Sequence, residues 1–327
     1  MKIGKVPENV LKRSVMKQLH YKRDEVILGP GIGEDCAALA LAEDEILVMS
    51  TDPITGTAKD IGKLAIQITA NDLASAGAEP IGVMLTILLP DGTREIALKR
   101  IMEQMECACR EAKMQILGGH TEVTAVVNQP VVNVAGVAKA KKGSLISTAG
   151  ARAVMDIVVS KWVGIEGTMI FAKEKEAELK EHFPADFVDT AIGFDRYLSV
   201  VPEAAVATQS SVAAMHDVTE GGLFGALWEM AEASGVGLEI DLKKIPIRQE
   251  TVEICEYFDV NPYGLISSGM MLMASADGNA LVLALQEAGI PATVIGKATE
   301  GNDRVIIRDE ERRFLEPPKT DELYKVL

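Results

Sequence analysis

IGKLAIQITANDLASAGAEP, residues 61–80, is the stretch that decides the fold of this chain. Its apolar residues recur at helical spacing, which predicts a helix over 62–76, and Gly77 suits the position just beyond a helix end. Two adjacent polar residues, Asn71 and Asp72, interrupt this otherwise apolar helix. They indicate a polar pocket beside the helix, and a solvated stripe is the alternative interpretation.

Strands and helices alternate on both sides of this helix in the first half of the chain. The pattern predicts strands at 46–49, 81–89 and 131–138 and helices at 7–19 and 93–113. The first of these strands would deliver Asp52 at its end. Residues 21–35 are polar and then rich in Gly and Pro, which is typical of a loop. We therefore expect a sheet covered by a long helix.

A polar stretch of small residues at 139–152 separates the two halves, and we place a domain boundary there. The second half again alternates strands and helices. The expected strands are 153–160, 236–241, 269–275 and 292–298, and the expected helices are 172–182, 186–199, 222–234 and 279–288. The prediction is a mixed α/β protein with two domains, residues 1–150 and 151–327.

Composition excludes several classes of function. The net charge of −15 over 327 residues argues against a nucleic-acid or anionic-membrane partner, because both require basic patches. The sequence has no run of about 18 apolar residues and no signal-peptide pattern. The cysteines Cys36, Cys107, Cys109 and Cys255 are spaced for neither a disulfide framework nor a zinc site. We therefore expect a cytoplasmic protein with reduced thiols.

Five short segments each place an acidic side chain among glycines or small residues. They lie at 31–38, 50–53, 69–74, 118–122 and 216–222. Buried carboxylates are costly unless they are paired or bind a cation. If several of these segments meet in space they need a metal, and Mg²⁺ carrying a polyphosphate is the obvious candidate. The segments therefore predict an ATP-using protein.

The first segment places two carboxylates behind a glycine-rich loop. The loop, residues 29–33, is a weak phosphate-binding signal because it lacks the Lys-Ser/Thr of a P-loop, and a flexible turn is the alternative. Glu34 and Asp35 strengthen the signal, because adjacent carboxylates beside backbone amides can hold a cation and the phosphates that it neutralises. For Asp52 in the second segment, the alternative interpretation is an Asx turn.

The last two segments combine glycines with a histidine or with the start of a helix. A lone histidine such as His120 is more often structural than catalytic, but Gly118 and Gly119 before it permit a ligand to approach the backbone closely. Asp217 precedes a predicted helix, whose N-terminus favours a phosphate or a metal-bridged phosphate. The alternative for Asp217 or Thr219 is a helix N-cap.

In this order, the segments resemble those of the aminoimidazole ribonucleotide (AIR) synthetase, or PurM-like, superfamily over nearly the whole chain. The resemblance rests on GIGEDCAA at 31–38, the stretch at 61–80 and HDVTEGGL at 216–223. That superfamily includes thiamine-monophosphate kinase and the hydrogenase maturation protein HypE. HypE is the member that four short sequence segments in the second half of the chain resemble most, at residues 234–237, 245–246, 261–262 and 268–269.

The resemblance implies two α/β domains, with the N-terminal sheet pairing into a barrel across a homodimer and ATP in a cleft near the interface. Carboxylates at the matching positions would hold Mg²⁺ on the triphosphate, namely Glu34, Asp35, Asp52, Asp72 and Asp217. Further contacts to the nucleotide are expected from Gly33, Lys63, Asn71, Gly118, Gly119 and Thr219. The ions would neutralise charge and orient the γ-phosphoryl group.

Two features depart from the pattern of the resemblance. His120 stands where kinase and HypE members have Asp, and His is a poor Mg²⁺ ligand. Glu122 is expected to replace it as a ligand, or one metal is lost, and we take His120 and Glu122 as candidate catalytic residues. HypE carries an acceptor Cys near its C-terminus, whereas the last cysteine here is Cys255.

The leading hypothesis is an ATP- and Mg²⁺-dependent enzyme that phosphorylates an oxygen of a small molecule or of a carbamoyl-type group. It would be HypE-like but without the C-terminal Cys. The alternatives are a nucleotide-binding assembly homodimer without catalysis and a thiamine-monophosphate kinase. The sequence does not identify the acceptor.

Overall fold

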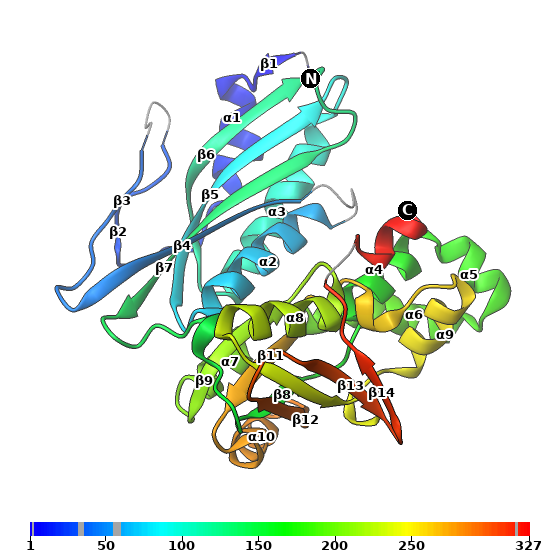
Figure 1. Ribbon diagram of the computed structural model, residues 1–327. Coiled ribbons are helices and arrows are strands. Elements are labelled where there is room, and N and C mark those ends of the chain that lie inside the picture. Colours follow the sequence, from blue (N-terminus) through cyan, green and yellow to red (C-terminus); the bar gives the residue numbers. More distant parts are fainter. Residues whose placement is uncertain (2, 32–35, 55–59, 318–319) are drawn as a thin grey trace. The chain divides into compact units, whose positions relative to one another are not determined.

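The chain folds into two units in the computed structural model, which describes residues 1, 3–31, 36–54, 60–317 and 320–327 (Figure 1). The first unit comprises residues 1–74 and 78–145, and the second comprises residues 75–77 and 146–327. Each combines a sheet with helices, so the expected mixed α/β class is confirmed. None of the described helices has the length and hydropathy that crossing a bilayer requires.

A five-stranded sheet in the order β1-β6-β5-β7-β4 forms the first unit. The strands are β1 Gly4–Lys5, β4 Glu45–Ile54, β5 Glu79–Pro90, β6 Gln115–Thr124 and β7 Val131–Lys141, and the helices are α1 Glu8–Ser14, α2 Ile61–Ser75 and α3 Glu95–Glu111. β5 and β6 run parallel, and the other neighbours are antiparallel. Helices α2 and α3 pack side by side, since a Cβ on Gly62 would lie 2.4 Å from the Ile101 carbonyl oxygen.

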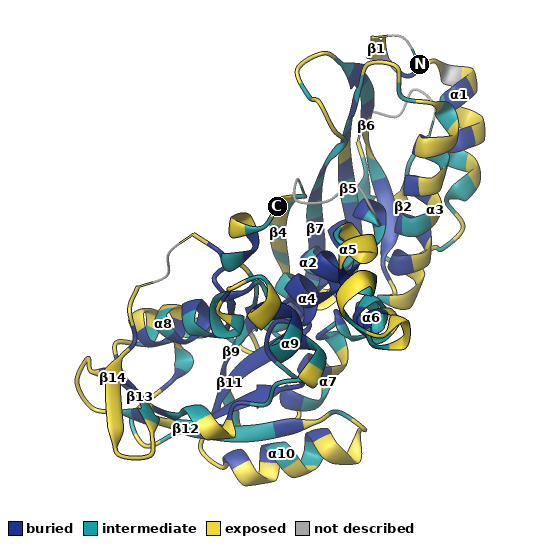
Figure 2. Cartoon of the chain, turned by 90° about the vertical axis from the view of Figure 1, so that its right-hand side faces the viewer, coloured by how far each residue is buried: buried dark blue, intermediate teal, exposed yellow. Residues whose placement is uncertain are grey.

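One face of this sheet packs against the helices and forms the core of the unit. Val83, Ile87 and Leu89 alternate along β5 and are at most 1% exposed. Strand side chains alternate between the two faces. The opposite face therefore carries Leu47 and Met49 of β4, which are 49% and 62% exposed. The sheet thus has a buried face and a face with exposed apolar side chains. Figure 2 shows, by colour, which residues of its strands are buried and which are exposed.

A small second sheet lies partly within the region predicted to be a loop. It pairs β2 Val26–Leu28 with β3 Ala38–Leu39 in antiparallel fashion. The loop prediction over 21–35 is therefore wrong for β2. The strand is short and Ile27 is 71% exposed, so the sequence shows no burial period there.

Charged side chains fix the start of β2 against the main sheet. Arg23 Nη2 lies 2.7 Å from Glu25 Oε1 and 2.7 Å from Glu79 Oε1 on β5. Lys139 Nζ on β7 lies 2.6 Å from Glu25 Oε1. The Arg23 guanidinium, followed by Lys139, holds the pKa of the Glu25 carboxyl group well below its usual range despite partial burial. This network joins segments that lie far apart in the sequence.

The second unit contains a seven-stranded sheet in the order β14-β13-β10-β12-β8-β11-β9. Its strands are β8 Asp156–Ser160, β9 Val212–Val218, β10 Gly237–Asp241, β11 Met270–Ser275, β12 Ala292–Thr299, β13 Arg304–Arg308 and β14 Glu311–Phe314. Its helices are α4 Ile165–Glu174, α5 Glu176–His182, α6 Ala185–Ile192, α7 Val201–Ala207, α8 Gly222–Ser234, α9 Gln249–Tyr257 and α10 Gly278–Glu287. Leu227 and Met230 of α8 pack with Leu272 of β11 in a continuous apolar core.

Local signals located some elements better than others. Helix α8 has the predicted bounds, and Gly235 ends it in the left-handed conformation at φ 64°. The single helix predicted over 172–182 is wrong, because the chain leaves helical geometry at Lys175 (φ −109°, ψ 25°) and forms α4 and α5. The sequence pattern predicts no element at the positions of β6, α7, β9, α9, β13 and β14.

Candidate functional site

The fourth acidic segment lies within a strand of the first unit. Gly118, Gly119, His120 and Glu122 all belong to β6, which runs parallel to β5. A register shift between β5 and β6 precedes Gly118. The two glycines therefore follow an irregularity in the sheet, at the place where the sequence analysis expected a backbone exposed to a ligand.

The backbone of the neighbouring strand explains why one of these two positions requires a glycine. A Cβ on Gly119 would lie 2.1 Å from the carbonyl oxygen of Leu85 on β5, which leaves no room for any side chain. A Cβ on Gly118 would lie 3.3 Å from Cε of Met84, the end of a flexible side chain. The close approach at Gly119 is thus to the adjacent strand. At Gly118 an added Cβ would crowd only the flexible Met84 side chain, so no backbone contact requires a glycine at this position.

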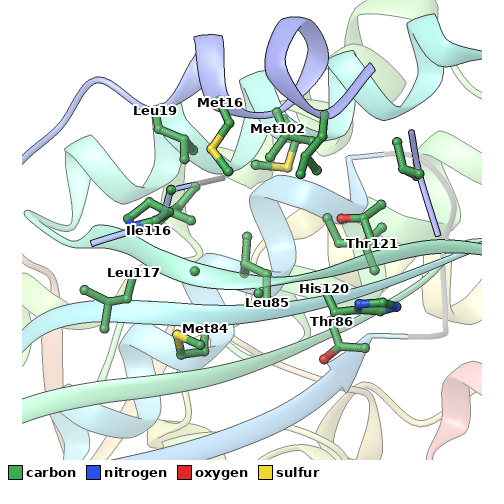
Figure 3. A pocket seen from close by; sticks show the side chains of 18 of the residues that line it. Met16, Leu19, Met84, Leu85, Thr86, Met102, Ile116, Leu117, His120 and Thr121 are labelled. Carbon is green, nitrogen blue, oxygen red and sulfur yellow. The ribbon is translucent and has the colours of Figure 1, made fainter. Parts of the chain in front are cut away.

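A cavity of about 780 Å³ opens beside this part of the sheet. Side chains from α1, the short 3-10 helix Met16–Gln18 that follows it, α3, β5 and β6 form its apolar wall, with Met16, Met102 and Ile116 among them (Figure 3). Gly31 and Cys36, from the first acidic segment, line the same cavity. Small-molecule sites commonly have volumes of about 300–1,000 Å³ and mostly apolar walls. The structure thus brings the first and fourth segments to one cavity of ligand size.

A few polar side chains also line the cavity. Thr86 of β5 lies between His120 of β6 and Asn133 of β7, since it pairs in register with both. The sequence analysis missed Thr86 and Asn133. Each is a single polar residue inside an otherwise apolar strand, which is the signal that could have found them.

His120 and Glu122 form a pair on the uncovered face of the sheet. His120 Nε2 lies 3.1 Å from Glu122 Oε2, and the two side chains are 47% and 37% exposed. They are two residues apart on one strand, so they project from the same face. A carboxylate orients an imidazole ring and fixes which nitrogen carries the proton. The pair can therefore act in proton transfer.

The second and third segments also meet. The Ser50 hydroxyl of β4 donates a hydrogen bond to Asp72 Oδ2 of α2. Asp52, two residues along β4, projects from the same face as Ser50 and is partly buried. Oxygen ligands of this kind, carboxylates with a hydroxyl, suit Mg²⁺. The geometry of Ser50, Asp52 and Asp72 therefore fits the predicted cation-binding role.

Other predicted contacts lie on the same helix or outside the described residues. Asn71 is 1% exposed, so this position of α2 is not part of a solvated stripe. Lys63 lies in the first turn of α2 and is partly buried. The predicted site residues Gly33, Glu34 and Asp35 lie outside the described residues.

The fifth segment belongs to the second unit. Asp217, at the end of β9, is 5% exposed and pairs in register with Met271 of β11. Thr219 accepts a hydrogen bond through its carbonyl oxygen from the Gly222 backbone N–H. The N-cap of α8 is Gly221, at φ 84°, which has no side chain of its own to cap the helix. The N-cap alternative for Asp217 and Thr219 therefore does not apply.

The described part of the chain contains no preformed cluster of three or more His, Cys, Asp or Glu side chains placed to hold a metal. Two of the five predicted metal ligands, Glu34 and Asp35, lie outside that part of the chain. In the first unit, Asp52, Asp72 and the Ser50 hydroxyl would be the groups that offer oxygen ligands to a cation. The phosphates of a bound nucleotide would have to complete the coordination.

Comparison with known families defines the class of protein. The family described as AIR synthase related protein, N-terminal domain, matches residues 33–140, and the corresponding C-terminal domain matches residues 156–309. A solved structure of HypE in complex with ATP has a TM-score of 0.82 at 22% identity, over 98% of this chain and 97% of that chain. A thiamine-monophosphate kinase from Stenotrophomonas maltophilia has a TM-score of 0.75 at 22% identity, over 94% and 98%. The chain thus has the PurM-like two-domain fold.

Sequence relatives identify the branch. Carbamoyl dehydratase HypE of Cupriavidus necator is 32% identical over 279 residues, which cover 82% of this chain and 77% of that protein. A hydrogenase expression/formation protein of Methanocaldococcus jannaschii is 29% identical over 332 residues, covering 99% and 97%. The chain belongs to the HypE family of hydrogenase maturation proteins, as the sequence resemblance indicated.

Proposed function

We propose that this protein is an ATP- and Mg²⁺-dependent enzyme that phosphorylates the oxygen of a carbamoyl-type group or of another small molecule. The observation that carries the proposal is the pairwise meeting of the acidic segments in the first unit. Gly31 and Cys36 share a cavity with Gly118 and His120, and Ser50 contacts Asp72. These segments are the ones that would contact a metal-bound nucleotide in the superfamily.

Each group of residues has a distinct role in this proposal. Asp52 and Asp72 would hold Mg²⁺, which supplies charge neutralisation at the transferring phosphoryl group. The apolar wall of the cavity excludes water from a bound ligand. His120, oriented by Glu122 at 3.1 Å, lies on the uncovered face of the sheet, opposite the face that carries Ser50 and Asp52, and would hold or remove a proton from an acceptor that reaches this uncovered face. The C. necator relative is named a carbamoyl dehydratase, and phosphorylation turns a carbamoyl oxygen into a phosphate leaving group.

Two of the four cysteines cannot carry the acceptor. Cys255 is 1% exposed, and burial, followed by the charge of Glu322, raises the pKa of its thiol to about 12. Cys109 is fully buried and its pKa is likewise raised by burial. Neither thiol is available to carry a carbamoyl group to the cavity.

We also propose that the protein is a homodimer through the exposed face of the first sheet. Leu47 and Met49 are exposed there, and in the superfamily this sheet pairs with that of a second copy. Analytical ultracentrifugation tests this, with Met49→Lys expected to give a monomer and Ile27→Lys, an exposed apolar position of the small sheet, expected to leave the dimer intact. A wild-type monomer at micromolar concentration would refute the proposal.

Isothermal titration with ATP and Mg²⁺ tests the nucleotide site. Asp72→Asn and Asp52→Asn should each weaken binding at least tenfold in the presence of Mg²⁺, because each removes a charged metal ligand. Asp44→Asn is the matched control: Asp44 is an exposed carboxylate of the same unit that pairs with Lys141 at 2.8 Å. Wild-type affinity in both site variants would show that the site is misplaced.

A non-catalytic assembly protein is the second candidate, and His120 in place of the usual Asp favours it. Phosphate release from ATP distinguishes the two candidates. Binding of ATP without turnover, over a panel of carbamoyl and small-molecule acceptors, would support the assembly role. Thiamine-monophosphate kinase activity is a third candidate, because the chain shares its fold with such a kinase. A direct assay for the formation of thiamine diphosphate tests this candidate.

A further inference from the structure

Three helices of the second unit form an outer layer that contributes no residue to the candidate site. Helices α5, α6 and α9 each pack against α4, of whose ten residues eight are buried. Helix α6 also contacts both α5 and α9, and Figure 2 shows exposed residues along α5 and α6. The surface formed by these three helices and by residues 183–184 and 258–259 is here called the outer helical face.

The outer helical face carries more than half of the net charge of the chain. Residues 176–192 and 249–259 contain nine carboxylates and a single lysine, which gives a formal charge of −8 out of −15. The lysine is already occupied, since Lys180 Nζ lies 2.9 Å from Glu176 Oε1 and 2.7 Å from Asp189 Oδ1. Within the described part of the chain, the carboxylates that pair with no basic side chain include Glu181, Asp186, Glu256 and Asp259. Like charges this close in sequence repel one another, and a positively charged partner would relieve that repulsion.

Aromatic rings gather on the same face, although only 4% of the residues in the chain are aromatic. Phe183 stacks on Phe187 with 5.2 Å between ring centroids, and it lies 5.9 Å from the Tyr257 ring. The Tyr257 ring lies 4.9 Å from that of Phe258. Tyr257 is 37% exposed, and Phe183 and Phe187 are only partly buried. The ring cluster therefore reaches the surface among the carboxylates.

Direct contacts join the ring cluster to the carboxylates. The Tyr257 hydroxyl donates a hydrogen bond of 3.1 Å to Glu178 Oε1. The ring of His182, which follows Glu181 in the chain, lies 4.7 Å from the rings of both Phe183 and Tyr257. Burial, followed by Glu178 and then by Glu181, raises the pKa of Tyr257. The rings and the carboxylates thus form one continuous surface.

We propose that the outer helical face is a docking surface for a protein partner that presents arginine side chains on a basic segment. A guanidinium group pairs with a carboxylate through two parallel hydrogen bonds and also stacks on aromatic rings, so it uses both features of this face. A lysine ammonium group lacks the planar fork that both contacts require. Charge complementarity also speeds the encounter of two proteins. The docking surface is independent of the proposed enzymatic function, because the two share no residue.

The charge of the face disfavours other occupants. Nucleic acids and anionic membranes are themselves negatively charged and would be repelled. A second copy of this chain, with a net charge of −15, offers no excess of positive charge. Among the described residues, no three His, Cys, Asp or Glu side chains are placed to hold a metal ion. A basic protein surface is the occupant that fits.

Titration of the full-length protein with hexa-arginine and hexa-lysine tests the docking surface. The measurements use about 0.1 M salt, where charges more than about 10 Å apart are largely screened. The chain has four histidines, so their imidazole signals can be followed individually by NMR. We expect hexa-arginine to shift the His182 signal saturably, while the signal of His216, which lies on β9 of the same unit, stays in place. Hexa-arginine should bind more tightly than hexa-lysine by a factor of about three or more.

Substitutions on the face and a matched control locate the binding. The double variant Glu181→Gln and Glu256→Gln should weaken hexa-arginine binding by a factor of about three to ten. Tyr257→Leu keeps every charge and should reduce the preference for hexa-arginine over hexa-lysine, because it removes a ring on which a guanidinium stacks. The control variant Glu287→Gln and Glu300→Gln removes two exposed carboxylates of the same unit outside the face. It should stay within a factor of about two of wild type.

Three results would overturn the proposal. The first is a His182 signal that hexa-arginine does not move, because the peptide then binds elsewhere or not at all. The second is equal affinity of the wild type for the two peptides, which means attraction by charge alone. The third is an equal loss of affinity in the face variant and in the control variant. The first two results come from the wild type, so the test stays decisive if a variant does not fold.

Discussion

Gly119→Ala is predicted to destabilise the first unit strongly, whereas the neighbouring Gly118→Ala is predicted to be tolerated. The added Cβ at position 119 would lie 2.1 Å from the Leu85 carbonyl oxygen and 2.9 Å from the Leu85 backbone carbon and nitrogen. Leu85 cannot retreat freely, because β5 is also paired with β7, where Leu85 lies opposite Val134. The clash is with backbone in the middle of the sheet.

Two contributions set the magnitude. Overpacking of a well-packed interior costs about 1–3 kcal/mol. The backbone at Gly119, with φ at 148°, adds about 1–3 kcal/mol for a residue with a side chain. We therefore expect a loss of about 2–6 kcal/mol. For Gly118→Ala the added Cβ would lie 3.3 Å from Met84 Cε, and alanine is intrinsically better than glycine inside an element by about 0.5–1 kcal/mol. The net change there should stay within about 1 kcal/mol.

Urea unfolding of both variants and the wild type measures these changes, and titration with ATP and Mg²⁺ is run on the folded proteins. If Gly118 borders the nucleotide, Gly118→Ala weakens ATP binding without lowering stability. A Gly119→Ala variant within about 1 kcal/mol of wild type would refute the steric reasoning. Equal stability losses in the two variants would refute the distinction between the two glycines.

Three further outcomes are expected. Glu203→Gln should lower the free energy of unfolding, measured with urea, by about 3–5 kcal/mol, because it leaves the buried Lys161 ammonium without the carboxylate that lies 2.7 Å from it. Replacing both residues by apolar ones should recover much of this loss of stability. The pKa of Glu25 is lowered, so its stabilising effect is present above about pH 4.5 and is lost as the pH falls. Glu25→Gln should accordingly lower stability at pH 7, and its difference from wild type should shrink below about pH 4 in denaturant titrations. In the native protein, Cys36 and Cys107 should react with a thiol reagent while the buried cysteines react only after unfolding.

Local sequence signals located some elements because their determinants lie within a few residues. Helix α8 is apolar along most of its length and lies between Gly221 and Gly235, both in the left-handed conformation. Strand β6 gave no such signal, because Gly118, Gly119 and His120 break its apolar run. That segment is a strand only because β5 pairs with it along nearly its whole length.

The same division holds for the candidate site. The adjacent polar residues Asn71 and Asp72 indicated a polar pocket beside α2. Asp72 does contact a polar side chain, the Ser50 hydroxyl of β4. The segments were predicted to meet around Mg²⁺ and the triphosphate of ATP, and within the first unit they meet in two pairs. The pairing of β5 with β7 places Thr86 and Asn133 side by side at the cavity, and no local sequence pattern encodes that pairing.

By itself, the sequence determined the family of this protein, its mixed α/β class and the order of its acidic segments, because these are carried by short runs of residues. The tertiary structure decided which residues touch. Gly119 faces the Leu85 carbonyl oxygen, and Asp321 holds the Gly221 N–H from 100 residues away. Such contacts depend on strand register and on the packing of distant segments, and folding selects them through burial of the whole core rather than through any local preference.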